Sequence, residues 1–160
     1  MAGIWRGRLA VTAAALGLGL AVAAGGALAQ SAGADAVKAR QANFKQLGGA
    51  FKTINDQLKA GAPDMAAIKA AASRMQALAA RAPDWFPAGS GPEAGVKTGA
   101  KPEIWSDAAG FATAARGLQA ATASLSAAAN GGDPAAVRAQ VAATGAACKA
   151  CHDKYRAKSS

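Results

Sequence analysis

The chain has 160 residues, with 18 lysines and arginines against 9 aspartates and glutamates, two cysteines and one histidine. One domain is the natural interpretation of this length. The net charge of +9 raises the question of nucleic-acid binding. The lysines are dispersed among alanines, however, and no basic cluster is interleaved with aromatic residues, so the composition argues against a nucleic-acid partner.

Residues 1–29 have the pattern of a secretory signal peptide. Two arginines among the first eight residues precede an almost unbroken apolar stretch at 9–24, and Ala27-Leu28-Ala29 offers small residues for cleavage. The stretch is short for a membrane span and contains two glycines, which makes a retained anchor the weaker alternative. We expect a mature chain of residues 30–160, outside the inner membrane, with no membrane span and a net charge of +7, because the leader removes two arginines and no acid.

Four helical stretches follow, and the first three carry apolar residues at helical spacing. The first stripe is Val37, Phe44, Leu47, Phe51, Ile54 and Leu58, and the second is Met65, Ile68, Met75 and Leu78. The third stretch begins near Pro102 and ends at Asn130-Gly131-Gly132. Asp133-Pro134, an N-cap followed by proline at the first helical position, opens the fourth.

The second and third stretches are joined by a long connection, Pro83 to Lys101, that is rich in glycine and proline. It carries Trp85 and Phe86, which we expect to pin it to the core as a bundle crossover. No β-hairpin signal or internal repeat is present. The pattern predicts an all-α fold, an antiparallel four-helix bundle.

The run Cys148-Lys149-Ala150-Cys151-His152 uses both cysteines and the only histidine, and it is typical of covalent attachment of haem c. Each thiol can bond one vinyl-derived carbon of the haem edge, and the next imidazole, that of His152, can then bind the iron. The haem therefore lies near the last helix.

Three rival interpretations of this run remain open. A thioredoxin-like redox pair requires a strand before it and a helix beginning at the first cysteine, whereas the preceding residues 133–147 have a helical pattern. A zinc site needs further ligands, which only carboxylates could supply. A plain disulfide or two incidental buried cysteines is the third alternative.

The chain resembles the cytochrome c′ family, bacterial periplasmic haem proteins with a four-helix bundle. The resemblance covers the mature chain and rests on residues 37–41 in the first helix, 101–107 at the start of the third, and Cys148 to Arg156. It implies one haem c, covalent through Cys148 and Cys151, with His152 as the proximal iron ligand. It also implies that Arg156 borders the proximal pocket and that Arg40 lies near the haem propionates. Each arginine also has a simpler explanation that does not involve haem. Arg156 would then be a solvated cation at the end of a helix, and Arg40 would lie on the polar side of the first helix.

The distal side of the iron separates two branches of this family. Low-spin, electron-carrying relatives have a methionine four residues after the first-helix arginine, and here that position is Phe44. A phenyl ring cannot bind iron, so we expect Phe44 to cover the sixth coordination position, although plain core packing explains it equally well. Met65 and Met75 are expected to fill gaps in the core, and Lys45 points away around the helix.

The sequence therefore predicts a five-coordinate, high-spin haem protein that binds nitric oxide and carbon monoxide. No catalytic acid–base pair is visible, which argues against an enzyme such as a nitric oxide reductase or peroxidase. The resemblance implies nitric oxide sequestration and electron transfer with a redox partner protein. The alternative is a methionine-ligated, low-spin electron-transfer shuttle. The resemblance further implies a homodimer, for which alanines 66, 67, 70 and 71 on the second helix would allow close helix approach.

Overall fold

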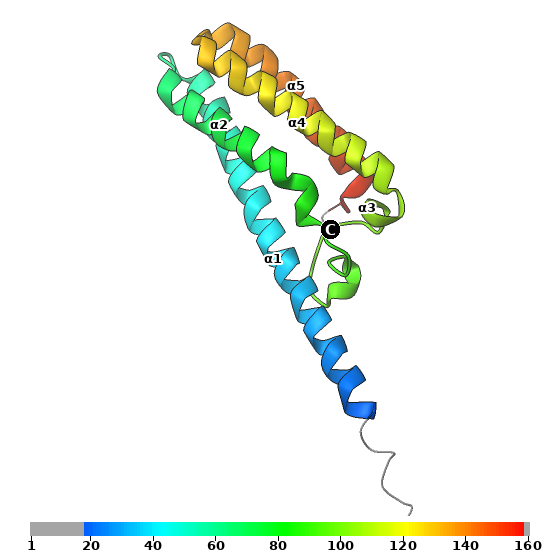
Figure 1. The fold of residues 1–160 in the computed structure, drawn as a ribbon. Coiled ribbons are helices and arrows are strands. Elements are labelled where there is room, and N and C mark those ends of the chain that lie inside the picture. Colours follow the sequence, from blue (N-terminus) through cyan, green and yellow to red (C-terminus); the bar gives the residue numbers. More distant parts are fainter. Residues whose placement is uncertain (1–17, 159–160) are drawn as a thin grey trace, which may run out of the picture.

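Four long helices lie side by side in the computed structural model, which describes residues 18–158, with side chains from residue 31 (Figure 1). They are α1 (Leu18–Lys59), α2 (Met65–Arg81), α4 (Ala108–Gly131) and α5 (Pro134–Tyr155). The chain runs along them in alternating directions, and α1 extends beyond the bundle at its N-terminal end (Figure 1). The predicted all-α, antiparallel four-helix bundle is confirmed.

The expected end of the third helical stretch at Asn130-Gly131-Gly132 and the expected start of the fourth at Asp133-Pro134 are confirmed. The Asp64 carboxylate accepts hydrogen bonds from the first-turn amides of α2, and Asp133 does the same for α5, with Pro134 at the first helical position. Gly132 ends α4 in the left-handed conformation, with φ of 77°. These caps satisfy amide and carbonyl groups that a helix end leaves without intrahelical partners.

The third helix differs from the prediction of a single helix beginning near Pro102. A short helix, α3 (Glu103–Ser106), comes first, and the backbone leaves helical geometry at Asp107, with φ of −116° and ψ of 55°. The Asp107 carboxylate then accepts a hydrogen bond from the Gly110 amide and caps α4. The apolar spacing continues through this break, so periodicity alone could not locate it.

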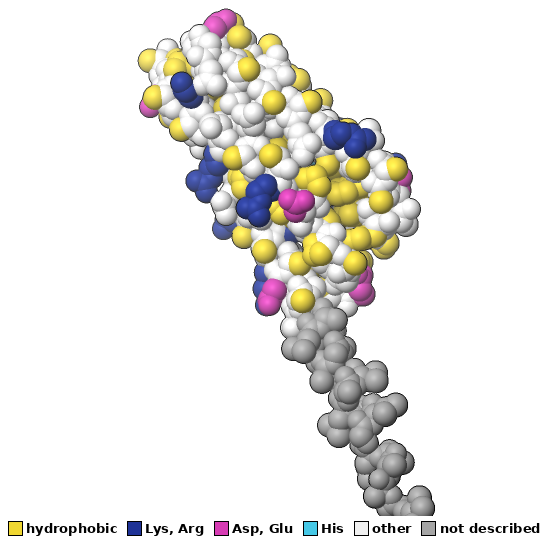
Figure 2. All heavy atoms as spheres, in the orientation of Figure 1, with side chains coloured by type: hydrophobic (Ala, Val, Ile, Leu, Met, Phe, Trp, Pro, Cys, Tyr) yellow, Lys and Arg dark blue, Asp and Glu magenta, His cyan; other side chains and the backbone are white. Residues whose placement is uncertain are grey.

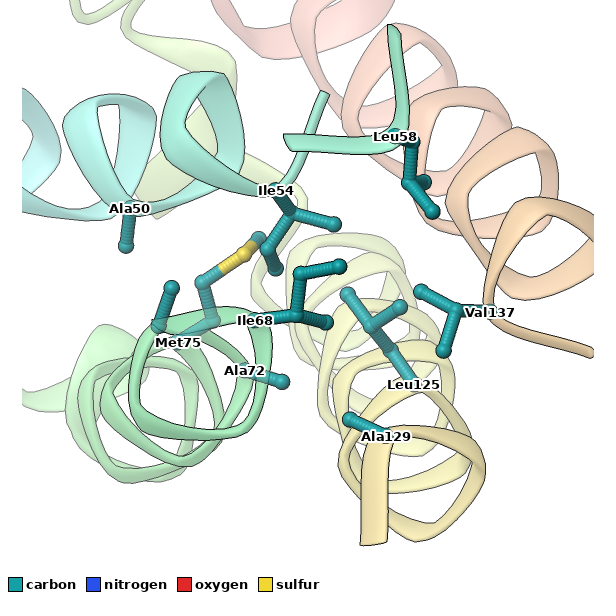
Figure 3. Packing of buried hydrophobic residues seen from close by; sticks show 10 residues of the cluster. Ala50, Ile54, Leu58, Ile68, Ala72, Met75, Leu125, Ala129 and Val137 are labelled. Carbon is teal, nitrogen blue, oxygen red and sulfur yellow. The ribbon is translucent and has the colours of Figure 1, made fainter. Parts of the chain in front are cut away.

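The core of the bundle is formed by one buried cluster with members on all four long helices. Ile54, Ile68, Leu125 and Val137 point toward one another between the helices, and Met75 lies beside Ile54 (Figure 3). All five are essentially inaccessible to solvent. We call this cluster the four-helix core. Within it, Ile54 of α1 packs with Ile68 of α2.

The crossover between α2 and α4 is held against the bundle. It contains two 3₁₀ turns, η1 (Ala82–Trp85) and η2 (Pro92–Ala94), and Trp85 is 8% exposed, which confirms the expected pinning role of this aromatic residue. The last residues of the crossover pair with the end of α5 and the residues that follow it. The Lys101 amide donates to the Tyr155 carbonyl oxygen, and the Ala157 amide donates to the Gly99 carbonyl oxygen. The crossover therefore meets the end of α5 that carries the C-x-x-C-H run.

The predicted cleavage position falls inside α1, whose helical backbone runs from Leu18 to Lys59. Residues 1–17 of the predicted signal peptide lie outside the described residues. Among the described helices, none combines the length and the apolar character needed to cross a membrane.

Candidate functional site

The two cysteines lie near the C-terminal end of α5, one helical turn apart. Residues three apart on a helix share a face, so both thiols project to the same side. Both are free and half-buried. Cys148 packs on an apolar group that we call the Phe44 cluster, whose other members are Phe44, Leu47, Leu78, Ala79 and Leu118. The Cys148 thiol therefore faces an apolar wall built by α1, α2 and α4, which suits a flat apolar cofactor edge.

The rival interpretations of the cysteine pair fit this geometry less well. Burial raises the pKa of both thiols, and the neighbouring Cys148 raises that of Cys151 further. A redox-active pair instead needs a lowered thiol pKa at the beginning of a helix, whereas Cys148 follows fourteen helical residues of α5. Within residues 18–158, no group of three or more His, Cys, Asp and Glu side chains could hold a metal ion.

His152 and Arg156 lie together at the end of α5. Both line a surface hollow with Lys149, Asp153, Ala157 and Lys158. Although the imidazole is exposed, nearby protein atoms partly desolvate it and lower its pKa, and the positive charge of Arg156 lowers it further. Arg156 is the first residue beyond α5: its backbone is extended, but its amide still donates to the His152 carbonyl oxygen. A lowered pKa favours the neutral imidazole, which is the form that binds metals.

Phe44 lies on the same apolar wall as Cys148. Its half-buried ring meets Trp85 edge-on, with centroids 4.9 Å apart and planes at 90°, and Phe86 at 6.1 Å. On the face drawn in Figure 2, apolar side chains gather near the crossover end of the bundle. The structure thus brings Phe44, predicted from α1, and Cys148, predicted from α5, into one cluster.

Arg40 lies one helical turn before Phe44 and is only 3% exposed. Its guanidinium donates to the Trp85 and Ser90 carbonyl oxygens and to the hydroxyls of Ser90 and Thr98, over 3.0 to 3.2 Å. Its carbon Cζ also lies 4.6 Å from the centroid of the Phe86 ring. Burial lowers the pKa of this group. Arg40 therefore attaches the crossover to α1. It is buried and is not simply a solvated residue on the polar side of the helix.

The methionines considered as iron ligands lie elsewhere. Met75 is 0% exposed within the four-helix core, and Met65 packs against the same core rather than against the Phe44 cluster. Lys45 is exposed. The gap-filling role expected for Met65 and Met75 is confirmed.

Asp107 connects the beginning of α4 with the end of α5. Its carboxylate accepts hydrogen bonds from the Tyr155 hydroxyl at 2.8 Å and from the Lys154 ammonium at 2.6 Å, besides capping the Gly110 amide. The bonds to Lys154 and Tyr155 hold the pKa of this carboxyl below its usual range. Tyr155 is 3% exposed and its ring packs edge-on against Phe111 at 5.3 Å. These contacts fix the helical turn that carries His152.

Asp107→Asn should destabilise the protein, because the amide can still cap Gly110 but loses the negative charge shared by Lys154 and Tyr155. The folded-state pKa is depressed, so the charged carboxylate stabilises the fold above the unfolded-state pKa. That stabilisation disappears as pH falls through the folded-state pKa. Thermal unfolding should therefore show a lower midpoint for Asp107→Asn at pH 7 and converging midpoints in acid. Asp56→Asn, which removes an exposed i,i+4 pair with Lys52, is the matched control and should change little.

Sequence reasoning missed three polar residues of the site. The sequence does not indicate Ser90 or Thr98 as partners of Arg40, although Ser90 is 0% exposed and both hydroxyls accept hydrogen bonds from Arg40. Asp107 was part of the segment that carried the family resemblance, but its capping and bridging role was not foreseen. Aspartate is a preferred N-cap residue, so a local signal exists for the cap but not for the bridge to Lys154 and Tyr155.

Residues 35–156 match the family model described as Cytochrome C′. The chain is 42% identical over 125 residues to cytochrome c′ from Alcaligenes xylosoxydans xylosoxydans, covering 78% of this chain and 94% of that protein. The crystal structure of cytochrome c′ from Thermochromatium tepidum is 33% identical with a TM-score of 0.73, over 78% of this chain and 95% of that one.

Two further solved structures are informative. A nitric oxide complex of a variant of cytochrome c prime from Alcaligenes xylosoxidans is 39% identical with a TM-score of 0.71, over 79% of this chain and 97% of that one. A cytochrome c′ with a ligand-controlled dimer dissociation is 31% identical, also with a TM-score of 0.71, over 78% of this chain and 95% of that one. This family consists of non-enzymatic haem proteins, and the cofactor is haem c, with Cys148 and Cys151 as the attachment pair.

Proposed function

The chain belongs to the cytochrome c′ family, and from this premise we propose that it binds nitric oxide and carbon monoxide at a five-coordinate, high-spin haem. The observation that carries the proposal is the position of Phe44, an aromatic ring that shares one apolar cluster with the attachment residue Cys148. The haem iron, when bound, supplies the bond to the diatomic gas. The side chains on the two sides of the haem determine how easily the gas reaches the iron.

On the proximal side, Cys148 and Cys151 hold the cofactor, and His152 offers its neutral imidazole to the iron. Arg156, beside His152 in the same hollow, borders this side. Tyr155 and Asp107 hold the supporting turn in place. We assign Arg40 to the propionate side of the haem; its positively charged guanidinium is buried among carbonyl oxygens of the crossover.

When haem is bound, Phe44 would cover the distal side of the iron. The ring excludes water and offers no hydrogen-bond donor that would stabilise bound oxygen. A gas must displace the ring to bind, so weak and slow binding of carbon monoxide is expected. The runner-up, a methionine-ligated electron shuttle, is disfavoured by the burial of Met75 in the four-helix core.

Absorption spectra of the ferric and ferrous protein test this function. Both states should be high spin, and Phe44→Ala should speed carbon monoxide association by about tenfold or more, because each ~1.4 kcal/mol removed from a barrier raises a rate tenfold. Phe51→Ala is the matched control: this phenylalanine lies two turns further along α1 and packs against the four-helix core, so its removal should leave the rate unchanged. A six-coordinate, low-spin spectrum of the unmodified protein contradicts the proposal.

We assign the protein to the periplasm, because residues 1–29 have the pattern of a signal peptide and the family resembled is periplasmic. Mass spectrometry of the periplasmic fraction should find a chain that begins at Gln30 and carries one haem. A haem-loaded chain that retains Met1 would contradict the assignment.

A homodimer is part of the same proposal. Ala66 and Ala70 are exposed on α2 and free to approach a second copy, whereas Ala71 is 8% exposed and belongs to the four-helix core. The related protein with a ligand-controlled dimer dissociation supports this assembly. Light scattering of the purified haem protein measures it, and a monomeric mass at all concentrations would exclude it.

A further inference from the structure

The crossover supplies a second layer of aromatic side chains behind Phe44. Trp85 meets the Phe44 ring edge-on at 4.9 Å, and Phe86 lies at 6.1 Å with its plane tilted by 59°. Phe86 is itself backed by Phe111 at 4.9 Å and Trp105 at 6.3 Å. The ring of Phe44 is therefore confined on this side by two aromatic rings of the crossover.

The crossover is fastened to α1 at the level of Phe44. Arg40, one turn earlier on the same helix, donates four hydrogen bonds to Trp85, Ser90 and Thr98 and lies over the ring of Phe86. Ser90 reinforces this attachment, since its hydroxyl donates to the Pro87 carbonyl oxygen at 2.7 Å. These buried bonds lie in a surrounding of low polarity, where breaking one of them leaves an unsatisfied group.

Two further contacts hold the same segment. The Gln41 amide donates to the Lys97 carbonyl oxygen at 2.9 Å. The backbone of Gly89 also approaches α1 so closely at Gly33 that a Cβ atom there would collide with the Gly89 carbonyl oxygen. The segment from Trp85 to Thr98 is thus attached to α1 at both of its ends and in its middle.

We propose that Trp85 and Phe86 form a gate that sets how readily Phe44 moves aside for an incoming gas, and that Arg40, bound to Ser90 and Thr98, is the latch of this gate. The inference rests on the proposed function of Phe44 as the distal cover of the iron. The gate residues do not touch the gas. They are positioning residues, because Trp85 and Phe86 pack directly against the Phe44 ring and restrict its movement on the side of the crossover.

The test removes the hydroxyls that hold the latch while keeping Arg40 and Phe44. The double variant Ser90→Ala, Thr98→Val of the haem-loaded protein should speed carbon monoxide association by about three- to tenfold, the population shift expected from losing one or two net hydrogen bonds. Hydrogen exchange of backbone amides in residues 86–98 should accelerate in the same variant. Its spin state should stay that of the parent, because no iron-facing side chain has changed.

Two control variants separate the gate from a general loosening of the bundle. Val137→Ala opens a cavity in the four-helix core, where Val137 is 0% exposed, and Thr53→Val removes an exposed hydroxyl that donates only within α1. Neither should change the association rate. Trp85→Leu tests the gate directly if the double variant does not retain haem, and it too should bind carbon monoxide faster.

The outcomes distinguish the two proposals. If Phe44→Ala speeds binding but neither the double variant nor Trp85→Leu does, the gate is refuted and the role of Phe44 stands. An equal acceleration by Val137→Ala also refutes the gate, because the effect would then follow stability alone. If Phe44→Ala itself has no effect, the proposed function fails and the gate fails with it.

Discussion

Replacing both Cys148 and Cys151 with alanine should abolish covalent haem. The two thiols lie on one face of α5, and no other cysteine exists in the chain to replace them. Denaturing electrophoresis with a haem stain should show no signal for the double variant, and each single variant should keep at most one thioether bond. The folded bundle should also unfold at lower temperature, because a cofactor bound only to the native state stabilises that state.

Serine replacements provide the matched control for this experiment. Cys148→Ser and Cys151→Ser together keep the side-chain size close to the original but cannot form thioethers, so they should fail in the same way as alanine. A haem stain that survives denaturation in either double variant would refute the attachment assignment.

Phe44→Met should convert the haem from high spin to low spin. The substitution places a thioether on the apolar wall beside Cys148, at the position where low-spin relatives carry their ligand, and methionine is flexible enough to adapt to the site. The absorption spectrum should change to that of a six-coordinate iron, and carbon monoxide binding should become slower still, because the gas must compete with a bound ligand.

Two variants at comparable positions check that the new sulfur is responsible. Phe44→Leu keeps an apolar side chain without a ligand atom and should remain high spin. Phe51→Met adds a thioether to the four-helix core, where Met75 already lies, and should also leave the spectrum unchanged. A high-spin spectrum for Phe44→Met would mean that position 44 does not face the iron.

The fold was predictable because its signals are local. The spacing of apolar residues such as Ile54 and Leu58 indicates which face of a helix is buried, and Asp133-Pro134 marks the beginning of a helix. The attachment run was predictable for the same reason, since its five residues are contiguous. The break at Asp107 escaped because it is stabilised by Tyr155 and Lys154, which are far away along the chain.

The environment of Arg40 was the least predictable part of the site. Its partners come from a segment rich in glycine and proline that resembles a solvent-exposed loop, and Ser90 lies between Gly89 and Gly91. Nothing in that composition reveals that the Ser90 side chain is buried. Only the folded crossover brings two carbonyl oxygens and two hydroxyls within reach of one guanidinium, so a role that depends on their convergence has no signature in the sequence.

The pairing of Ala100 with Arg156 has a consequence for the order of folding. These residues are separated by the whole α4–α5 hairpin, so their contact closes a long loop of the chain. Contacts of large sequence separation cost more chain entropy than neighbouring ones, and they form once the intervening helices have already shortened the loop. We therefore expect the segment after α5 to dock late, after α4 and α5 have paired. Docking of that segment against the crossover then completes the native state.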